Sequence, residues 1–102
     1  MHIHKHVHKK NKSESLLKPP LSTQTGSGFV LLHKGEEVGE HLTEKKEEVI
    51  YIIQGEALVT IEDEKEYLEA GSLLYIPPHK KHNLKNESDE DLRYMYVVSH
   101  FK

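Results

Sequence analysis

The sequence predicts an all-β protein whose antiparallel strands form a sandwich or barrel. Short apolar runs follow one another from residue 28 to the end of the chain, and turn residues separate them. No stretch shows the apolar repeat of an amphipathic helix. A chain of 102 residues has the size of one domain. We therefore expect a tail and arm over residues 1–27 and one β-barrel domain over residues 28–102.

The first ten residues read MHIHKHVHKK, with His2, His4, His6 and His8 at every second position. In an extended chain this spacing places all four imidazoles on one side, and such a row can chelate nickel, copper or zinc. A solvated tail or a purification sequence would have the same composition. The sequence favours these two simpler interpretations, because a terminal run has little to hold it in place.

Residues 11–27 combine two prolines with several Ser and Thr, and Leu16, Leu17 and Leu21 are their only sizeable apolar residues. This composition predicts an arm rather than a domain. We expect the arm to lie across the barrel or across a partner subunit.

Turn signals divide the rest of the chain into short strands. The predicted strands are residues 29–33, 40–42, 49–53, 57–61, 66–68, 73–76, 82–85 and 92–100. Gly55 is expected to supply the positive φ of a tight hairpin between residues 49–53 and 57–61. Pro77 and Pro78 end the strand before them, because proline cannot donate to a sheet ladder.

Two of these strands, residues 49–53 and 94–98, are apolar on both alternating faces. A strand in a solvated barrel would be apolar on one face only. The arm around Leu16 to Leu21 or a second subunit must therefore cover the outer face. We expect a homodimer with Val49, Tyr51 and Ile53 or their neighbours near the contact, together with the arm around Leu16 to Leu21.

Composition excludes several classes of function. The chain has no cysteine and a formal net charge of −3, with acidic and basic residues interspersed. Disulfides, thiolate metal sites and thiol catalysis are therefore excluded, and nucleic acid is not an expected partner. The longest apolar run is too short to span a bilayer, and the N-terminus lacks the apolar core of a signal peptide. We expect a cytoplasmic protein with no membrane partner.

Two stretches carry the candidate site. The first, Gly35–Gly55, holds His41 and, seven residues later, Glu48. The second, Gly71–Asn86, repeats this arrangement with a strand, a proline turn and His82. Imidazole nitrogens and carboxylate oxygens are ligands that divalent iron, manganese, nickel and zinc accept. The sequence therefore predicts a metal site built from both stretches.

The two stretches resemble the paired motifs of the cupin superfamily. The first family motif contains a glycine, a His-x-His pair, a glutamate and a second glycine, and the second contains a glycine, Pro-x-Gly, a histidine and an asparagine. The residues in register are Gly35, His41, Glu48, Gly55, Gly71, Pro77, His82 and Asn86. Thr43 stands in place of the second histidine, and His79 stands in place of the glycine after proline. The resemblance implies a double-stranded β-helix, or jelly-roll barrel.

The resemblance also implies one divalent metal ion (Fe, Mn, Ni or Zn) bound by His41, Glu48 and His82. A small barrel can bring such inward-pointing groups together near its mouth. Two imidazoles and one carboxylate leave coordination positions open on iron(II).

Thr43 is a poor ligand for a transition metal, so the metal site lacks one of the family's ligands. His79 is the nearest substitute along the sequence. We expect Glu44 and Glu47 to be solvated charges. The tyrosines that fit either a pocket wall or packing at an interface are Tyr51, Tyr75, Tyr94 and Tyr96.

The leading functional interpretation is a cupin that binds a divalent metal and a small, oxygen-rich organic ligand inside the barrel. The resemblance implies activity of the dioxygenase, isomerase or decarboxylase type, with the metal as Lewis acid. The sequence identifies no separate catalytic base. One alternative is a metal-free module that binds or senses a small molecule through Glu48 and His82. Another is a metal-handling protein that acts through its N-terminal histidines.

Overall fold

The computed structural model describes residues 1–101 and confirms an all-β architecture. The strands are β1 (Glu14–Leu17), β2 (Thr25–Leu32), β3 (His41–Leu42), β4 (Lys46–Gln54), β5 (Glu56–Ile61), β6 (Glu64–Glu69), β7 (Leu73–Ile76), β8 (Lys81–Lys85) and β9 (Leu92–His100). A short 3-10 turn, η1 (Val7–Lys9), precedes them. No helix in the described part of the chain is long and apolar enough to cross a membrane.

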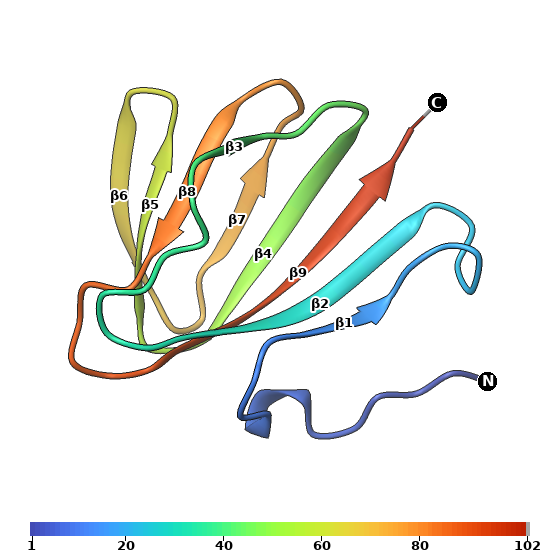
Figure 1. Cartoon of the computed structure of the whole chain (residues 1–102), viewed down its shortest axis with the longest axis horizontal. Helices are drawn as coiled ribbons and strands as arrows, with labels where there is room; N and C mark the ends of the chain where they lie inside the picture. The colour runs from blue at the N-terminus through green and yellow to red at the C-terminus, as the bar shows by residue number, and fades with distance from the viewer. Residues whose placement is uncertain (102) are drawn as a thin grey trace.

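The strands form two antiparallel sheets. The five-stranded sheet has the order β1-β2-β9-β4-β7, and the four-stranded sheet has the order β3-β8-β5-β6. Figure 1 shows β4, β9 and β2 fanning out side by side, with β5, β6 and β8 forming the other wall. This arrangement is the jelly-roll barrel that the sequence predicted.

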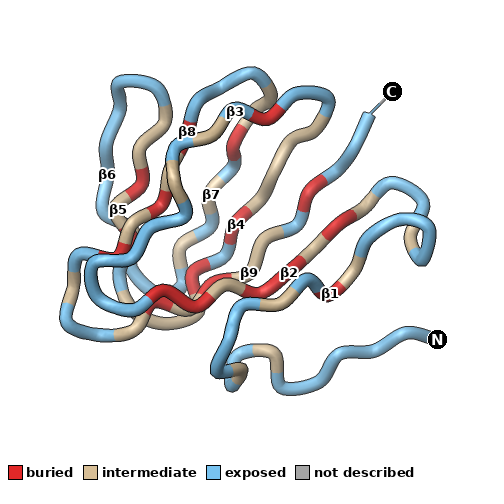
Figure 2. Tube along the Cα trace, in the orientation of Figure 1, coloured by how far each residue is buried: buried red, intermediate tan, exposed pale blue. Residues whose placement is uncertain are grey.

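Side chains from both sheets meet in the interior. The buried core consists of Leu32, Ile50, Ile52, Ala57, Val59, Ile76, Leu84, Leu92 and Tyr94. On β4 and β9, every second residue points inward, which is the period expected of a strand with one face on a core. Figure 2 shows the buried segments along the middle of the sheets and an exposed N-terminal segment.

The expected hairpin at Gly55 is wrong. The strands on either side of it lie in different sheets, because β4 pairs with β7 and β9 whereas β5 pairs with β6 and β8. Both strands carry apolar inner faces, and these pack across the interior rather than side by side. Gly55 has φ +85°, and a Cβ there would lie 2.5 Å from the Asp91 carbonyl oxygen. The glycine therefore lets the chain cross between the sheets directly over the backbone at Asp91.

The arm contributes a strand that the sequence did not predict. β1 pairs with β2, with Glu14 opposite Phe29 and Ser15 opposite Gly28. Leu16 points to the outer face of the sheet, where it is buried in a second cluster with Phe29 and Leu31. The arm therefore covers part of the outer face. This was one of the two covers expected from the sequence, the other being a second subunit.

The remainder of that outer face is open. Tyr51, Leu73, Tyr75 and Val97 are between 41% and 71% exposed. They lie on adjacent strands, because Tyr51 pairs with Leu73 in the register of β4 and β7, while Val49 pairs with both Tyr75 and Val97. These side chains form one apolar patch on the five-stranded sheet.

Candidate metal and ligand site

His41 and His82 meet in the barrel although 40 residues separate them. They are paired in the register of β3 and β8, and their ring centroids lie 4.0 Å apart at an interplanar angle of 62°. His82 is 1% exposed, and His41 is partly exposed. The structure therefore brings together two of the three predicted metal ligands.

Hydrogen bonds to backbone carbonyls fix the tautomers of both rings. His41 Nδ1 lies 2.9 Å from the Gly39 oxygen, and His82 Nδ1 lies 3.1 Å from the Lys80 oxygen. A carbonyl only accepts, so Nδ1 carries the proton in each ring and the neutral ring has a free lone pair on Nε2. Metal-binding histidines are commonly oriented by such a second hydrogen bond.

His82 Nε2 has no hydrogen-bond partner although it is buried. Burial, the largest cause, lowers the pKa of this imidazole, and the hydrogen bond to the Lys80 carbonyl oxygen opposes this shift only in part. The ring is thus held neutral, as a metal ligand must be. An unsatisfied buried polar atom costs on the order of 1–3 kcal/mol, so a ligand for this nitrogen would stabilise the site.

Glu48 lies on the inward face of β4 and lines the same cavity. Burial raises the pKa of its carboxyl, and the positive charges on His41 and Lys46 oppose that shift. Within residues 1–101, however, no group of three His, Asp or Glu side chains lies close enough to hold a metal ion.

Thr43 is buried, and its Oγ1 also has no hydrogen-bond partner. It follows His41 by two residues, in the position where the family pattern has a histidine. The expected substitute, His79, is exposed and does not line the cavity that holds His41 and His82. Its φ is +64°, a left-handed conformation that glycine adopts more easily, which explains the glycine of the family pattern. Glu44 is exposed, and Glu47, the residue before Glu48 on β4, lies on the opposite face of that strand.

Asn86, the last residue of the second motif, has a structural role. Its fully buried amide nitrogen donates to the carbonyl oxygens of Leu32 at 2.9 Å and Glu90 at 2.8 Å. Its oxygen accepts from the backbone N–H and the hydroxyl of Ser88. These hydrogen bonds hold the turn between β8 and β9 against the end of β2.

A cavity of about 470 Å³ extends from the histidine pair between the sheets, within the range of roughly 300–1,000 Å³ seen for small-molecule sites. Its walls consist of Ser15, Leu17, Lys18, Gly26, Ser27, Val30, Leu32, Val38, His41, Lys46, Glu48, His82, Leu84, Tyr94, Tyr96, Val98 and His100. Burial raises the pKa of the Tyr94 and Tyr96 hydroxyls, and the Glu48 charge raises both further. Both phenols therefore stay protonated at neutral pH and can donate hydrogen bonds to a ligand.

Several cavity residues were not predicted as site residues. Lys46 could have been found, because strand alternation places it on the same face as Glu48. The role of Gly28, which does not itself line the cavity, could not be found, because it depends on Tyr96, the residue opposite it on β9. A Cβ at position 28 would lie 2.4 Å from the Tyr96 hydroxyl oxygen, so the absence of a side chain there gives the phenol its place.

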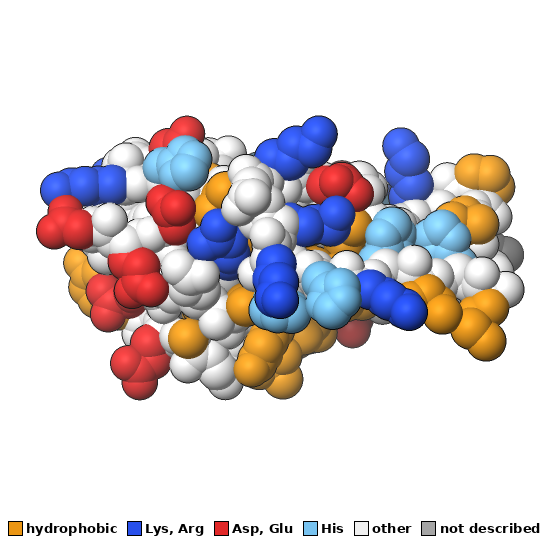
Figure 3. Space-filling model, turned by 90° about the horizontal axis from the view of Figure 1, so that it is seen from below, with side chains coloured by type: hydrophobic (Ala, Val, Ile, Leu, Met, Phe, Trp, Pro, Cys, Tyr) orange, Lys and Arg blue, Asp and Glu red, His pale blue; other side chains and the backbone are white. Residues whose placement is uncertain are grey.

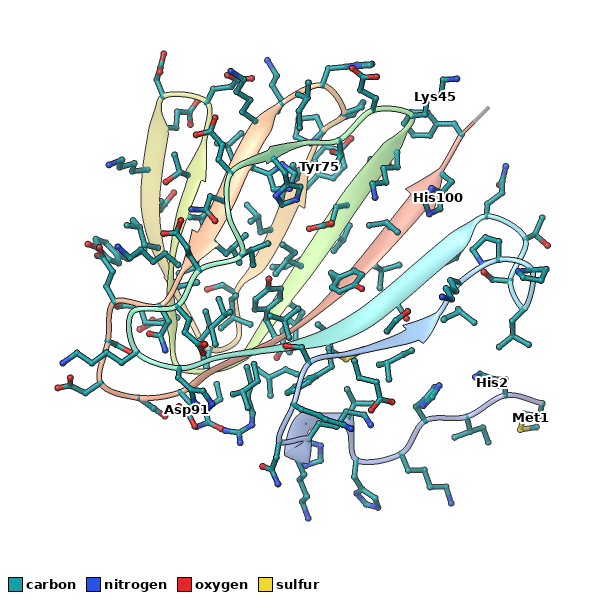
Figure 4. All side chains as sticks on the ribbon, viewed as in Figure 1. Met1, His2, Lys45, Tyr75, Asp91 and His100 are labelled. Carbon is teal, nitrogen blue, oxygen red and sulfur yellow. The ribbon has the colours of Figure 1, made fainter. Side chains whose placement is uncertain are left out.

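The N-terminal histidines lie apart from this site. His2 and His4 approach each other, with 3.1 Å between their Nε2 atoms, and His4 Nε2 lies 2.9 Å from the Leu16 carbonyl oxygen. Both side chains are exposed. Figure 4 shows His2 on the N-terminal segment, well away from β3 and β8. Figure 3 shows several histidines and lysines close together on the face seen from below, from the centre to the right of the view, and most of the acidic side chains at the left.

A family model for the cupin domain matches residues 28–98, which is most of the chain. The protein is a cupin. The match covers the histidine pair, Glu48 and the barrel, and it begins after β1. The resemblance of the two motifs is thereby confirmed.

This cupin is similar to proteins of polyketide synthesis. It is 30% identical over 83 residues to polyketide synthase CurC of Streptomyces cyaneus, an alignment that covers 78% of this chain and 54% of CurC. It is 27% identical over 95 residues to the tetracenomycin polyketide synthase protein TcmJ of Streptomyces glaucescens, covering 90% of this chain and 64% of TcmJ. The chain thus spans between half and two thirds of the length of these relatives.

Solved cupin structures share the fold. The cupin domain of Schizosaccharomyces pombe Cnp3 superposes with a TM-score of 0.80 at 20% identity, covering 86% of this chain and 63% of that one. A predicted oxalate decarboxylase from Thermotoga maritima superposes with a TM-score of 0.81 at 22% identity, covering 87% of this chain and 79% of that one. At these identities the likeness shows the fold alone.

Proposed function

We propose that this cupin binds one divalent metal ion, of iron, manganese, nickel or zinc, through His41, His82 and Glu48. The observation that carries the proposal is the pair of imidazoles with Nδ1 held by backbone carbonyls and with the buried Nε2 of His82 lacking a partner. Both imidazoles therefore suit a metal ion, and Glu48 is the carboxylate in the same cavity. When bound, the metal would supply Lewis-acid chemistry and an anchor for a substrate oxygen.

We further propose that a small organic molecule occupies the cavity beside the metal. The volume of the cavity, the two protonated phenols and the apolar wall support this proposal. Decarboxylase, dioxygenase or isomerase activity would fit such a site. No residue of the cavity stands out as a general base.

A metal-free binding function is the second candidate. Two observations favour it: no third ligand is gathered with the histidine pair within residues 1–101, and burial raises the pKa of Glu48. A protonated Glu48 would donate a hydrogen bond to a ligand oxygen, and His82 Nε2 would accept one. The same cavity would then serve as a binding or sensing site.

Metal analysis of protein purified without a metal-affinity step separates these functions. The variants to compare are His82→Ala, His33→Ala as an exposed-histidine control, and a variant with His2, His4, His6 and His8 all changed to Gln. Metal retained by the control and the quadruple variant but lost from His82→Ala supports the barrel site. Absence of metal from every form, even after incubation with iron(II), manganese(II), nickel(II) or zinc(II), supports the metal-free function. Loss in the quadruple variant alone assigns the metal to the N-terminal segment.

A further inference from the structure

The mouth of the cavity carries an uneven distribution of charge. Lys18, Lys46 and His100 line it, and Glu48 is the one acidic residue among the described residues of its wall. The chain as a whole has a formal net charge of −3. Two lysines therefore face one carboxylate on this wall, although acidic residues outnumber basic ones in the chain as a whole.

The strand register brings two of these groups together. Lys46, at the start of β4, is directly opposite His100, at the end of β9. Figure 4 shows His100 at this end of β9, on the side where β2 lies. The third group, Lys18, follows β1 at the other side of β2, so the three side chains reach the cavity from different strands of one sheet.

The imidazole of His100 lies close to Gly26 on β2. A Cβ at Gly26 would lie 3.6 Å from His100 Nε2 and 2.9 Å from a methyl carbon of Val98. The imidazole therefore lies above β2, at the cavity, in the volume next to the missing side chain. Its Nε2 is available to a molecule that enters there.

Among residues 1–101, neither ammonium group has an ion-pair partner. The ion pairs of this part of the chain involve Lys10, His33, Lys34 and Lys85, and none of its carboxylate oxygens lies within 4.0 Å of Lys18 or Lys46. Unpaired cations at the low-dielectric wall of a cleft attract anions more strongly than freely solvated cations do. The opening is thus suited to a negatively charged group.

We propose that this cavity takes a small organic acid, with its carboxylate at the mouth between Lys46, His100 and Lys18 and its apolar body against Val98 and Leu84. The inference rests on the proposed function only in taking this cavity as the ligand site. It adds the chemical class of the ligand and the residues that select it, and it does not depend on a bound metal.

The test compares benzoate with benzamide, which have similar shapes but differ in charge. Binding is followed by two-dimensional NMR titration of the full-length protein after metal removal by EDTA, so that no metal can bind the carboxylate. Benzoate is expected to bind about tenfold more tightly than benzamide, a difference of ~1.4 kcal/mol. The advantage should shrink between about 0.02 M and 0.2 M salt, because added ions screen partly exposed charges.

Substitutions test which residue makes benzoate bind more tightly than benzamide. Lys46→Gln should abolish most of the preference for benzoate and leave benzamide binding unchanged, and Lys46→Arg should restore the preference. Lys45→Gln is the matched control, since Lys45 is the neighbouring residue and does not line the cavity. Equal affinity for the two compounds, or a benzoate preference that survives Lys46→Gln, overturns the inference.

The outcome of the benzoate test can be distinguished from the outcome of the metal-binding test. A benzoate preference that depends on Lys46 in protein that binds no metal supports the acid site and rejects the metal site. If the protein binds metal but its metal-free form shows no preference for benzoate, the metal site is supported and the acid site is rejected.

Discussion

The backbone N–H of His79 donates a hydrogen bond of 2.9 Å to the carbonyl oxygen of Thr43. The two positions at which this chain departs from the cupin motifs are therefore in direct contact. The bond ties the proline turn between β7 and β8 to the connection between β3 and β4. A change at either position acts on the backbone that carries the histidine pair.

Thr43→His should restore the family's additional ligand. Because Thr43 is buried two residues after His41, the new imidazole would lie beside the existing pair and should tighten metal binding by more than about tenfold. Overpacking should lower the stability of the metal-free protein by roughly 1–3 kcal/mol. Calorimetric titration with nickel(II) or manganese(II) measures the first effect and thermal unfolding the second.

Thr43→Val is the matched control, because it removes the unpartnered hydroxyl without enlarging the side chain. It should leave metal affinity unchanged and stabilise the metal-free fold by roughly 1 kcal/mol. Unchanged metal affinity in Thr43→His would show that position 43 does not face the metal.

Glu48→Gln tests the carboxylate ligand. It preserves size and removes the anion, so it should weaken metal binding and reduce the stabilisation by added manganese(II) by ~1.4 kcal/mol for each tenfold loss of affinity. In metal-free protein the same change should be neutral or stabilising, because a partly buried charge disappears.

Glu47→Gln, on the other face of β4, removes the same charge from the same strand and should change neither quantity. Thermal unfolding with and without metal gives both results. If the metal-dependent increase in melting temperature is the same in Glu48→Gln as in the unaltered protein, Glu48 is not a ligand.

Gly55→Ala and Gly71→Ala separate conformational strain from steric exclusion. Both residues have positive φ, +85° and +92°, so both substitutions carry a similar backbone cost. Only position 55 is crowded, with the Asp91 carbonyl oxygen 2.5 Å from the new Cβ, whereas position 71 has no atom within 4 Å. Denaturant unfolding should show a loss of roughly 1 kcal/mol for Gly71→Ala and at least ~3 kcal/mol for Gly55→Ala. Equal losses would mean that the close approach over Asp91 is not maintained in solution.

His33 should make stability depend on pH in a defined direction. The hydrogen bond to the Asp91 carboxylate, at 2.8 Å, and its charge raise the pKa of this imidazole above the ordinary 6.5. A raised folded-state pKa means that the pair's contribution is fully present below pH 6.5 and is lost as the pH rises through the folded-state value.

An NMR titration of Asp91→Asn should show the pKa of His33 returning toward 6.5. Asp89→Asn, which removes the neighbouring partner of Lys34, should leave the His33 titration in place. An identical His33 titration in all three proteins would exclude the ion pair.

We propose that a second copy of the chain covers the apolar patch of Tyr51, Leu73, Tyr75 and Val97. An apolar stripe of this kind is unusual on a monomer, and the arm reaches only the part of the face around Phe29 and Leu31. Tyr75→Lys should shift the protein from dimer to monomer in sedimentation equilibrium at high micromolar concentration. Tyr67→Lys, an equally exposed position on β6, should have no effect. A monomeric unaltered protein would contradict the proposal.

The barrel and part of the site could be predicted because local patterns determine them. Apolar alternation and turn residues located every strand from β2 to β9, and the spacing of the motifs identified His41 and His82 as a pair. The crossing at Gly55 was misassigned, because the sequence shows that the chain turns but not whether the flanking strands share a sheet. β1 was missed because four residues containing one serine give no clear period.

The walls of the cavity were beyond prediction for a different reason. They depend on cross-strand neighbours such as Gly28 and Tyr96, whose approach is set by register rather than by sequence spacing. Among residues 1–101, whether a third ligand is gathered with the histidine pair likewise depends on how the strands pack in three dimensions. Neither the cavity walls nor the groups around the histidine pair can be inferred from residue spacing alone.

The arm supplies Ser15, Leu17 and Lys18 to the cavity, yet it precedes the segment that matches the cupin family. Part of the cavity wall is therefore encoded outside the segment that carries the histidine pair. An edge strand can diverge without disturbing the core, since it pairs on one side only. Exchange of residues 14–18 between cupins would accordingly be an evolutionary route to a new ligand that leaves the histidines untouched.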